Sequence, residues 1–154
     1  MSDVKIALQL YTVRDHMEKD VAGTLKKVKE IGFDYVEPAG YFNKTAEEFK
    51  ALLDEADLVA ISTHYGIENL EKDLEGSIVY HKTIGTKYIA IPWMDRARAP
   101  GGEKWEDTRP KLEKFAAALQ EQGLQLLYHN HDFEYELVDG KPALDLMYQA
   151  LPNM

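Results

Sequence analysis

Apolar runs alternate with amphipathic segments along this chain, and three amphipathic segments end in glycine immediately before an apolar run. Ile31-Gly32, Ile84-Gly85 and Gln122-Gly123 occupy these positions. A glycine there can close a helix in the left-handed conformation before the chain enters a strand. Short strands of nearly continuous apolar character are typical of parallel sheets. The pattern therefore predicts an α/β fold whose parallel strands are joined by right-handed crossovers.

The alternation amounts to about five βα units. The second helix has the clearest start signal, because Thr45 and Glu48 have the spacing of a capping box. Residues 94–103 are expected to form a polar loop. We expect strands over residues 4–10, 35–37, 58–63, 88–91 and 124–129, and helices over residues 20–31, 45–56, 70–84, 111–122 and 144–151.

A chain of 154 residues can bury a core of its own, and we assign residues 1–154 to a single domain. Five βα units fit either an open doubly wound sheet or part of a (β/α)8 barrel, which needs about 250 residues. Length alone favours the open sheet. In both architectures, functional side chains gather where the strands end and the following loops begin.

Composition and charge exclude several classes of protein. Eighteen basic residues against 27 acidic residues give a formal charge of −9, whereas a nucleic-acid partner requires a basic patch. The chain has no cysteine, which excludes disulfides and thiolate nucleophiles. No apolar run has the length of a membrane span, and the first residues lack a signal-peptide pattern. We therefore expect a cytoplasmic protein without nucleic-acid or membrane partners.

The run Tyr128-His129-Asn130-His131-Asp132-Phe133-Glu134 directly follows the apolar residues 124–127. Histidines two residues apart point to the same side of a strand. A carboxylate, Glu134, follows where the strand should give way to a loop. Imidazoles and carboxylates that converge at the carboxyl end of a strand are typical of metal-assisted or acid–base sites. Glu134 can also be an ordinary loop carboxylate.

Polar and aromatic side chains also follow the other predicted strands. Glu37 comes after buried Val36, and a buried carboxylate is costly unless it is paired or ligated. It is therefore either functional or paired with a lysine or arginine. His64 is either functional or a hydrogen-bonded residue at the rim. Tyr11 and Trp93 either pack at the rim or stack on sugar rings.

The remaining charged and histidine side chains have simpler interpretations. His16 and His81 fall in or before helices and are interpreted as structural. Arg96 and Arg98, near the rim, either belong to a solvated loop or hold an anionic substituent of a ligand. The chain has neither a phosphate-binding glycine loop nor a Gly-x-Ser-x-Gly elbow. A nucleotide-binding fold and a serine hydrolase are therefore unsupported.

Three segments, Ile6–Asp15, Lys29–Glu37 and Tyr128–Glu134, resemble in this order the sugar phosphate isomerase/epimerase family of the xylose isomerase-like TIM-barrel superfamily. The resemblance spans residues 4–151. It implies a parallel (β/α) TIM-barrel fold that is incomplete here, the N-terminal five-eighths. It also implies a sugar or cyclitol isomerase, epimerase or dehydratase that transfers a proton next to a carbonyl, assisted by Mn²⁺, Mg²⁺, Co²⁺ or Zn²⁺.

The resemblance also implies roles for individual residues at the mouth of the barrel. His129 stands where sugar epimerases of the superfamily have a metal-binding glutamate, and further ligands come from strands six to eight. We assign catalytic roles to Glu37, His131 and Glu134, substrate binding to Tyr11, His64 and Trp93, and metal binding to His129.

Five parallel strands that do not close leave the first and last strands as exposed edges. We expect these edges to be covered by self-association into a homo-oligomer, and we expect a small-molecule carbohydrate as the ligand. Because a site at the mouth draws on several strands, the chain alone should have little activity. The alternative is a non-catalytic sugar-binding or assembly module made of an incomplete barrel.

Overall fold

The elements of the chain follow one another as strand and helix from end to end. The computed structural model describes residues 4–154. In chain order, the elements are β1 (Ala7–Gln9), η1 (Leu10–Val13), α1 (Arg14–Met17), α2 (Val21–Ile31), β2 (Tyr35–Glu37), α3 (Ala46–Glu55), β3 (Val59–Ala60), β4 (Ser62–His64), α4 (Ile67–Lys72), α5 (Leu74–Ile84), β5 (Tyr88–Ile91), η2 (Arg96–Arg98), α6 (Trp105–Glu121), β6 (Gln125–Tyr128), η3 (Phe133–Tyr135), β7 (Leu137–Val138), β8 (Lys141–Pro142) and α7 (Ala143–Ala150).

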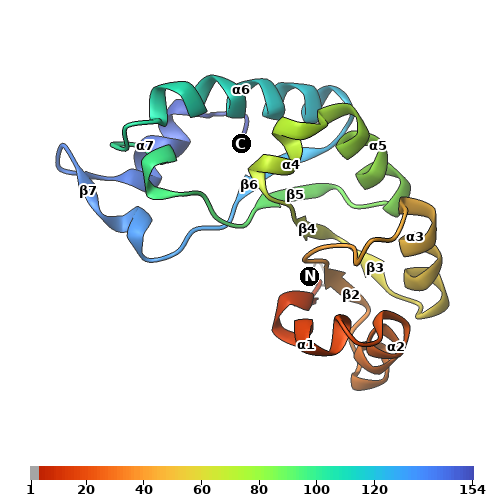
Figure 1. Ribbon diagram of the computed structural model, residues 1–154. Helices are drawn as coiled ribbons and strands as arrows, with labels where there is room; N and C mark the ends of the chain where they lie inside the picture. Colours follow the sequence, from red (N-terminus) through yellow and green to blue (C-terminus); the bar gives the residue numbers. More distant parts are fainter. Residues whose placement is uncertain (1–3) are drawn as a thin grey trace.

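Strands β1 to β6 run parallel, in two sheets ordered β1-β2-β3 and β4-β5-β6. β3 and β4 are two parts of one predicted strand, interrupted at Ile61, whose N–H donates to the Val36 carbonyl at 3.1 Å. A parallel bridge between Ala39 and His64 continues the pairing beyond β2. The two sheets therefore form one curved layer, which Figure 1 shows running from β2 to β6.

The strands bury mainly the side that faces the helices. Val36 and Leu126 are fully buried, whereas their neighbours Glu37 and Gln125 are only partly buried. Helices α2, α3, α5 and α6 lie along the outer side of the curve (Figure 1). A doubly wound sheet covers both faces, so this one-sided burial selects the barrel-type arrangement. The incomplete parallel (β/α) fold, without a closed barrel, is confirmed.

Buried side chains form two clusters, one for each half of the chain. The first packs α2 and α3 against β2, with Leu25, Phe49 and Leu53 at its centre. The second packs α6 and α7 against β5 and β6, with Leu112 and Met147 at its centre. Full burial of each such side chain contributes roughly 1.5–3 kcal/mol. The two clusters hold the strand ends in fixed positions relative to one another.

Local signals in the sequence account for the helix ends. Gly32, Gly85 and Gly123 have φ values of 111°, 81° and 78°, as the pattern predicted. The capping box is present, since Thr45 accepts from the Glu48 N–H and Glu48 accepts from the Thr45 N–H. In residues 4–154 we find no helix with the length and apolar character needed to cross a membrane.

Four segments differ from the prediction. The helix expected over residues 70–84 is split into α4 and α5 at Asp73, whose carboxylate caps α5 by accepting from the Gly76 N–H at 2.9 Å. Helix α6 begins at Trp105 and contains Pro110, so it starts before the predicted residue 111. The first strand ends at Gln9, where η1 begins. The β7–β8 hairpin lies where no regular structure was expected.

Candidate functional site

A cavity of about 810 Å³ lies at the carboxyl ends of the strands. The segments after β1, β2, β4, β5 and β6 all contribute to its wall. The chain therefore brings residues far apart in sequence to one place, as parallel strands do at their carboxyl ends. Of the residues predicted for the site, those lining the cavity are Tyr11, His64, Trp93, His129 and His131.

Both ring nitrogens of His64 are engaged by neighbouring strands. Gln9 Nε2 lies 2.8 Å from His64 Nδ1, and Glu37 Oε1 lies 3.1 Å from His64 Nε2. The Gln9 side-chain carbonyl accepts from the Tyr11 N–H, so the Gln9 amide nitrogen faces His64 and donates. Nδ1 therefore accepts, and Nε2 carries the proton that is donated to Glu37.

Glu37 is paired with a histidine, and not with the lysine or arginine that its non-functional interpretation required. Burial raises the carboxyl pKa most, but hydrogen bonding to His64 and Ser62 and the charges of the neighbouring histidines together outweigh it and hold the pKa of Glu37 below its ordinary value. The side chain keeps 22% of its surface exposed. Glu37 is therefore an ionised and partly exposed carboxylate, although it does not itself line the cavity.

His64, His129 and His131 form a row of three imidazoles. The ring centroids of His64 and His129 are 4.7 Å apart, and those of His129 and His131 are 5.1 Å apart. Partial burial of the His129 ring and the two neighbouring imidazoles lower the pKa of His129, because protonation would place like charges side by side. His129 is therefore suited to accept a proton or to bind a metal ion as a neutral ring.

Glu134 lies behind the histidine row. It is 0% exposed, and its Oε1 accepts from the Tyr128 hydroxyl at 2.5 Å. Its Oε2 accepts from the His131 N–H at 2.7 Å. Glu134 borders a separate cavity of about 310 Å³ near Arg96. The structure thus places Glu134, like Glu37, outside the set of residues that line the 810 Å³ cavity.

The residues present do not form a metal centre by themselves. In the part of the chain that the structure describes, no group of three or more His, Cys, Asp or Glu side chains could hold an ion. The nitrogens of His64 are engaged by Gln9 and Glu37. His129 and His131 remain, and two imidazoles are fewer than the three protein ligands of a typical catalytic zinc site.

The loop between β2 and α3 forms a wall that the sequence analysis did not single out. Phe42 and Asn43 have φ values of 54° and 58°, and both line the cavity. Non-glycine residues rarely adopt this conformation, and such strain clusters at functional sites. Among the described residues that line the cavity, Lys44 is the only lysine or arginine, and there is no Asp or Glu.

Behind this wall lies a hydrogen-bonded network. His81 is fully buried, and its Nδ1 donates to the Ser77 carbonyl at 2.6 Å. Its Nε2 therefore accepts from the Tyr41 hydroxyl, 2.9 Å away. The Tyr41 and Thr63 hydroxyl oxygens lie 2.8 Å apart. The network attaches Tyr41, a cavity residue, to helix α5.

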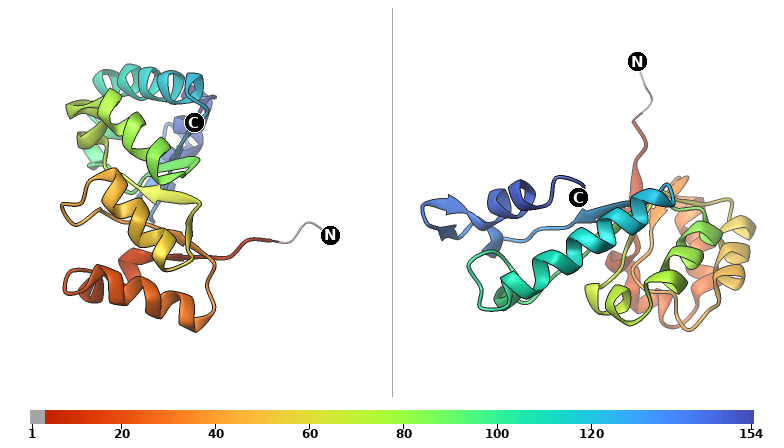
Figure 2. Two further views of the ribbon diagram at one scale, coloured as in Figure 1. Left: turned by 90° about the vertical axis from the view of Figure 1, so that its right-hand side faces the viewer. Right: turned by 90° about the horizontal axis from the view of Figure 1, so that it is seen from above.

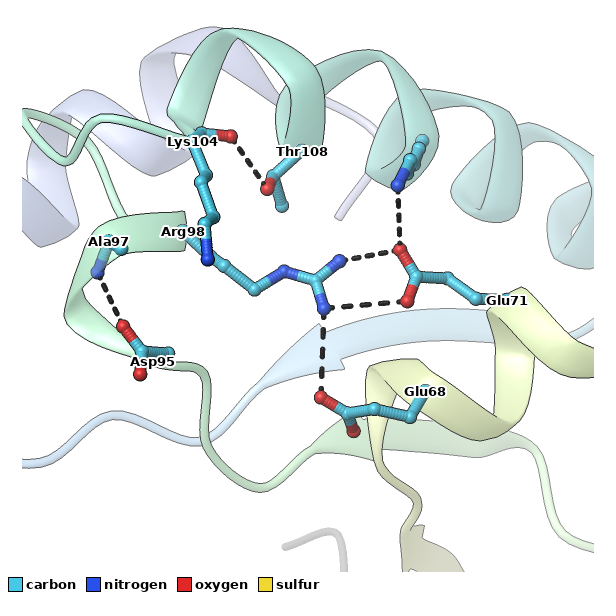
Figure 3. Close-up of polar contacts among 8 residues, drawn as sticks. Glu68, Glu71, Asp95, Ala97, Arg98, Lys104 and Thr108 are labelled. Carbon is cyan, nitrogen blue, oxygen red and sulfur yellow. Dashed lines mark hydrogen bonds and ion pairs between the residues drawn. The ribbon is translucent and has the colours of Figure 1, made fainter.

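The two rim arginines are occupied by carboxylates. Arg96 Nη1 lies 2.5 Å from Glu136 Oε1. Arg98 Nη2 lies 2.5 Å from Glu71 Oε1, and its Nη1 lies 3.6 Å from Glu68 Oε1, as Figure 3 shows. The Arg98 pairs fasten η2 to α4, and the Arg96 pair fastens η2 to the end of η3. Neither arginine lines the 810 Å³ cavity, so the structure gives no support to their interpretation as an anion-binding pair.

Comparisons with known proteins agree with this geometry. A family model described as xylose isomerase-like TIM barrel matches residues 25–147. A comparison with curated proteins found no match. Among solved structures, the chain is similar to a sugar phosphate isomerase/epimerase from Parabacteroides distasonis, with a TM-score of 0.77 and 17% identity over 97% of this chain and 66% of that chain.

Two further structures have the same fold. One is a xylose isomerase-like TIM barrel protein from Mycobacterium smegmatis in complex with magnesium, with a TM-score of 0.62 and 17% identity over 97% of this chain and 72% of that chain. The other is an AP endonuclease, family 2, from Brucella melitensis, with a TM-score of 0.58 and 13% identity over 71% of this chain and 49% of that chain.

At such identities the likeness shows the fold alone. The chain spans 66% of the Parabacteroides structure and 49% of the Brucella structure. The family model, in contrast, covers most of the chain, from α2 to α7. The chain belongs to the xylose isomerase-like TIM barrel family.

Proposed function

We propose that this chain carries part of a sugar or cyclitol isomerase or epimerase site, which transfers a proton next to a carbonyl group. The observation that carries the proposal is the row of His64, His129 and His131 in the wall of one strand-end cavity, with Glu37 paired to His64 beside it. Removal of a proton from carbon needs a base, and the developing enolate needs a group that stabilises its oxygen. The cavity offers candidates for both.

Glu37 is the proposed base. The hydrogen bond from His64 holds its Oε1, which leaves Oε2 to meet the substrate. Glu37 takes the proton from the carbon beside the carbonyl, and the electron pair of that C–H bond moves to the carbonyl oxygen. His131 donates a hydrogen bond to this oxygen. Return of the proton to the other face of the same carbon epimerises the sugar. Return of the proton to the former carbonyl carbon isomerises it, with the hydroxyl proton of the neighbouring carbon passing to the former carbonyl oxygen so that a new carbonyl forms there.

The cavity wall supports a carbohydrate as the ligand. Tyr11 and Trp93 are 57% and 50% exposed. The Arg14 guanidinium lies over the Tyr11 ring, and the remaining exposed ring surface of the two residues can stack on a sugar. Lys44 and three imidazoles line the cavity without any carboxylate. This charge balance supports a sugar that carries a negative group, as the name of the Parabacteroides sugar phosphate isomerase/epimerase suggests.

Metal assistance would need ligands beyond those described. His129 and His131 can supply two imidazoles, and we assign no step to a metal. The described residues also leave the outer edges of β1 and β6 without a partner strand. We propose that self-association covers these edges, because an open edge readily pairs with another chain.

A non-catalytic sugar-binding module is the second candidate. It is favoured by the lack of a metal-holding group within residues 4–154. Exchange of hydrogen for deuterium separates the two candidates, because it reports proton removal even without net turnover. We would incubate the chain with ketose phosphates in D₂O and follow the hydrogen beside the carbonyl by NMR.

Exchange by the wild-type chain that is lost in Glu37→Gln, with sugar binding kept, would support proton transfer. Sugar binding without exchange would favour the binding module. Lack of both would refute the proposed function for this chain.

A further inference from the structure

The run Tyr128–Glu134 closes on itself through its last side chain. Glu134 reaches back to accept the His131 N–H at 2.7 Å and the Tyr128 hydroxyl at 2.5 Å. Tyr128 and Glu134 are 6% and 0% exposed. The two histidines of the run face the cavity. The run therefore has a buried side, made of Tyr128 and Glu134, and a cavity side, made of His129 and His131.

The buried side holds a carboxylate with two donors. Burial and the neighbouring Glu134 raise the pKa of Tyr128, so its hydroxyl keeps its proton and remains a donor. Hydrogen bonds to a buried carboxylate are strong, and the loss of one such bond leaves a buried charge unsatisfied, which costs folding free energy. The Glu134 carboxylate is therefore fixed to the last residue of β6 and to the backbone of the following turn.

This contact restrains the backbone that carries the His131 ring. A fixed N–H fixes the peptide plane before His131 and with it the position of the His131 Cα. The ring then lies parallel to Phe133, with centroids 6.1 Å apart and planes 9° apart. The planes of the His131 and His129 rings, in contrast, meet at 69°. Phe133 thus stacks on the imidazole, while Glu134 holds the backbone N–H of the same residue.

We propose that Glu134 is a positioning residue that fixes His131 through the backbone and exchanges no proton with a ligand. Only the statement that His131 acts on a substrate rests on the proposed function. A proton-transfer role would require the Glu134 carboxyl group to reach the cavity, whereas its two oxygens already accept from Tyr128 and His131.

Two variants of Glu134 separate geometry from charge. In Glu134→Gln the side chain keeps its length, so its oxygen can accept from the His131 N–H and its amide can donate to the Tyr128 oxygen. In Glu134→Asp the charge stays, but the side chain is too short to reach both partners. Tyr128→Phe removes one partner and leaves the His131 contact, which makes it the matched control.

The readouts are the His131–Phe133 ring NOEs and the hydrogen-exchange rate of the His131 amide, both measured by NMR on the full chain. Positioning predicts wild-type values in Glu134→Gln and Tyr128→Phe. In Glu134→Asp it predicts weakened NOEs and amide exchange on the order of tenfold faster. Thermal melting monitored by circular dichroism checks that each variant is folded.

Wild-type NOEs and amide protection in Glu134→Asp would overturn the proposal. Loss of the NOEs in folded Glu134→Gln would also overturn it. So would a Glu134→Gln variant that keeps the NOEs but loses the exchange of the sugar hydrogen for deuterium that the wild type shows. Should Glu134→Asp fail to fold, the NOEs of Glu134→Gln still decide. A wild type without deuterium exchange would count against the proposed function, while the NMR result would still test the positioning of His131.

Discussion

His64 Nε2 lies 3.1 Å from Glu37 Oε1, and the far side of the same ring is held by Gln9. The imidazole is therefore a fixed donor to the carboxylate. This relationship makes Glu37 and His64 a unit assembled by three strands, β1, β2 and β4. It also gives the first prediction.

The Glu37 pair should stabilise the fold at neutral pH and lose this effect in acid. The pKa of Glu37 is lowered on folding, so its contribution is complete above the unfolded value of about 4.3 and is lost as the pH falls through the lower folded value. We expect Glu37→Gln to lower the free energy of unfolding by about 1 kcal/mol at pH 7 and by less at pH 3. Urea denaturation measures this, with exposed Glu121→Gln as control.

His81 should make the fold sensitive to mild acid. Burial lowers its pKa to about 4, against about 6.5 in an unfolded chain. The unfolded state therefore binds the proton first, and stability should fall by about 2–3 kcal/mol between pH 6.5 and pH 4. Urea denaturation across this range measures the loss. Titration of the His81 ring near pH 6.5, followed by NMR, would contradict the prediction.

The chain alone should bind Zn²⁺ and Mn²⁺ only weakly. The cavity offers His129 and His131 as imidazoles outside the Glu37–His64 pair, and residues 4–154 contain no group arranged to hold an ion. Changing both histidines to alanine should weaken the residual Zn²⁺ binding by about tenfold or more. Calorimetric titration tests this, with exposed His16→Ala as control. Tight binding of one ion per chain would show that the described residues suffice.

Lys44 should discriminate between charged and neutral sugars. We expect Lys44→Met to weaken binding of fructose 6-phosphate by about tenfold and to leave binding of fructose unchanged. Because the contact is between charges, added salt should reduce the difference. Titration followed by NMR measures both affinities, with Lys26→Met, on the exposed side of α2, as control. Equal losses for both sugars would assign Lys44 to the shape of the wall.

Self-association should be visible in solution. The unpaired edges of β1 and β6 lie at the two ends of the curved layer, which Figure 2 shows in two further views. We expect analytical ultracentrifugation to find a species larger than the 17.6 kDa monomer. A monodisperse monomer at all concentrations would refute the proposal that copies of the chain cover these edges.

Local sequence signals predicted the elements that depend on local physics. The capping box at Thr45 and the left-handed glycines depend on neighbouring residues only, and both are present. The start of α6 at Trp105 was missed because Lys104, the residue before it, offers no side-chain cap. The β7–β8 hairpin was missed because two-residue strands carry no periodic signal.

The site was predictable to the extent that parallel strands gather their carboxyl ends. That rule alone brings His64 to His129 across β5. It says nothing about loops, and the placement of Glu134 and Lys44 depends on loop backbone conformation. The left-handed residues Phe42 and Asn43 have no pattern in the sequence from which the wall of the cavity could be inferred.

The order of the strands has a consequence for how the chain acquires its fold. Each parallel strand pairs only with strands next to it in sequence, β1 with β2 and β2 with β3, then β4 with β5 and β5 with β6. Among the described strands, β1 to β6 need no partner strand from the far end of the chain, so the entropic cost of closing the connecting loops is small. The arc can therefore grow one βα unit at a time as the polypeptide leaves the ribosome, with each new strand docking on the one before it.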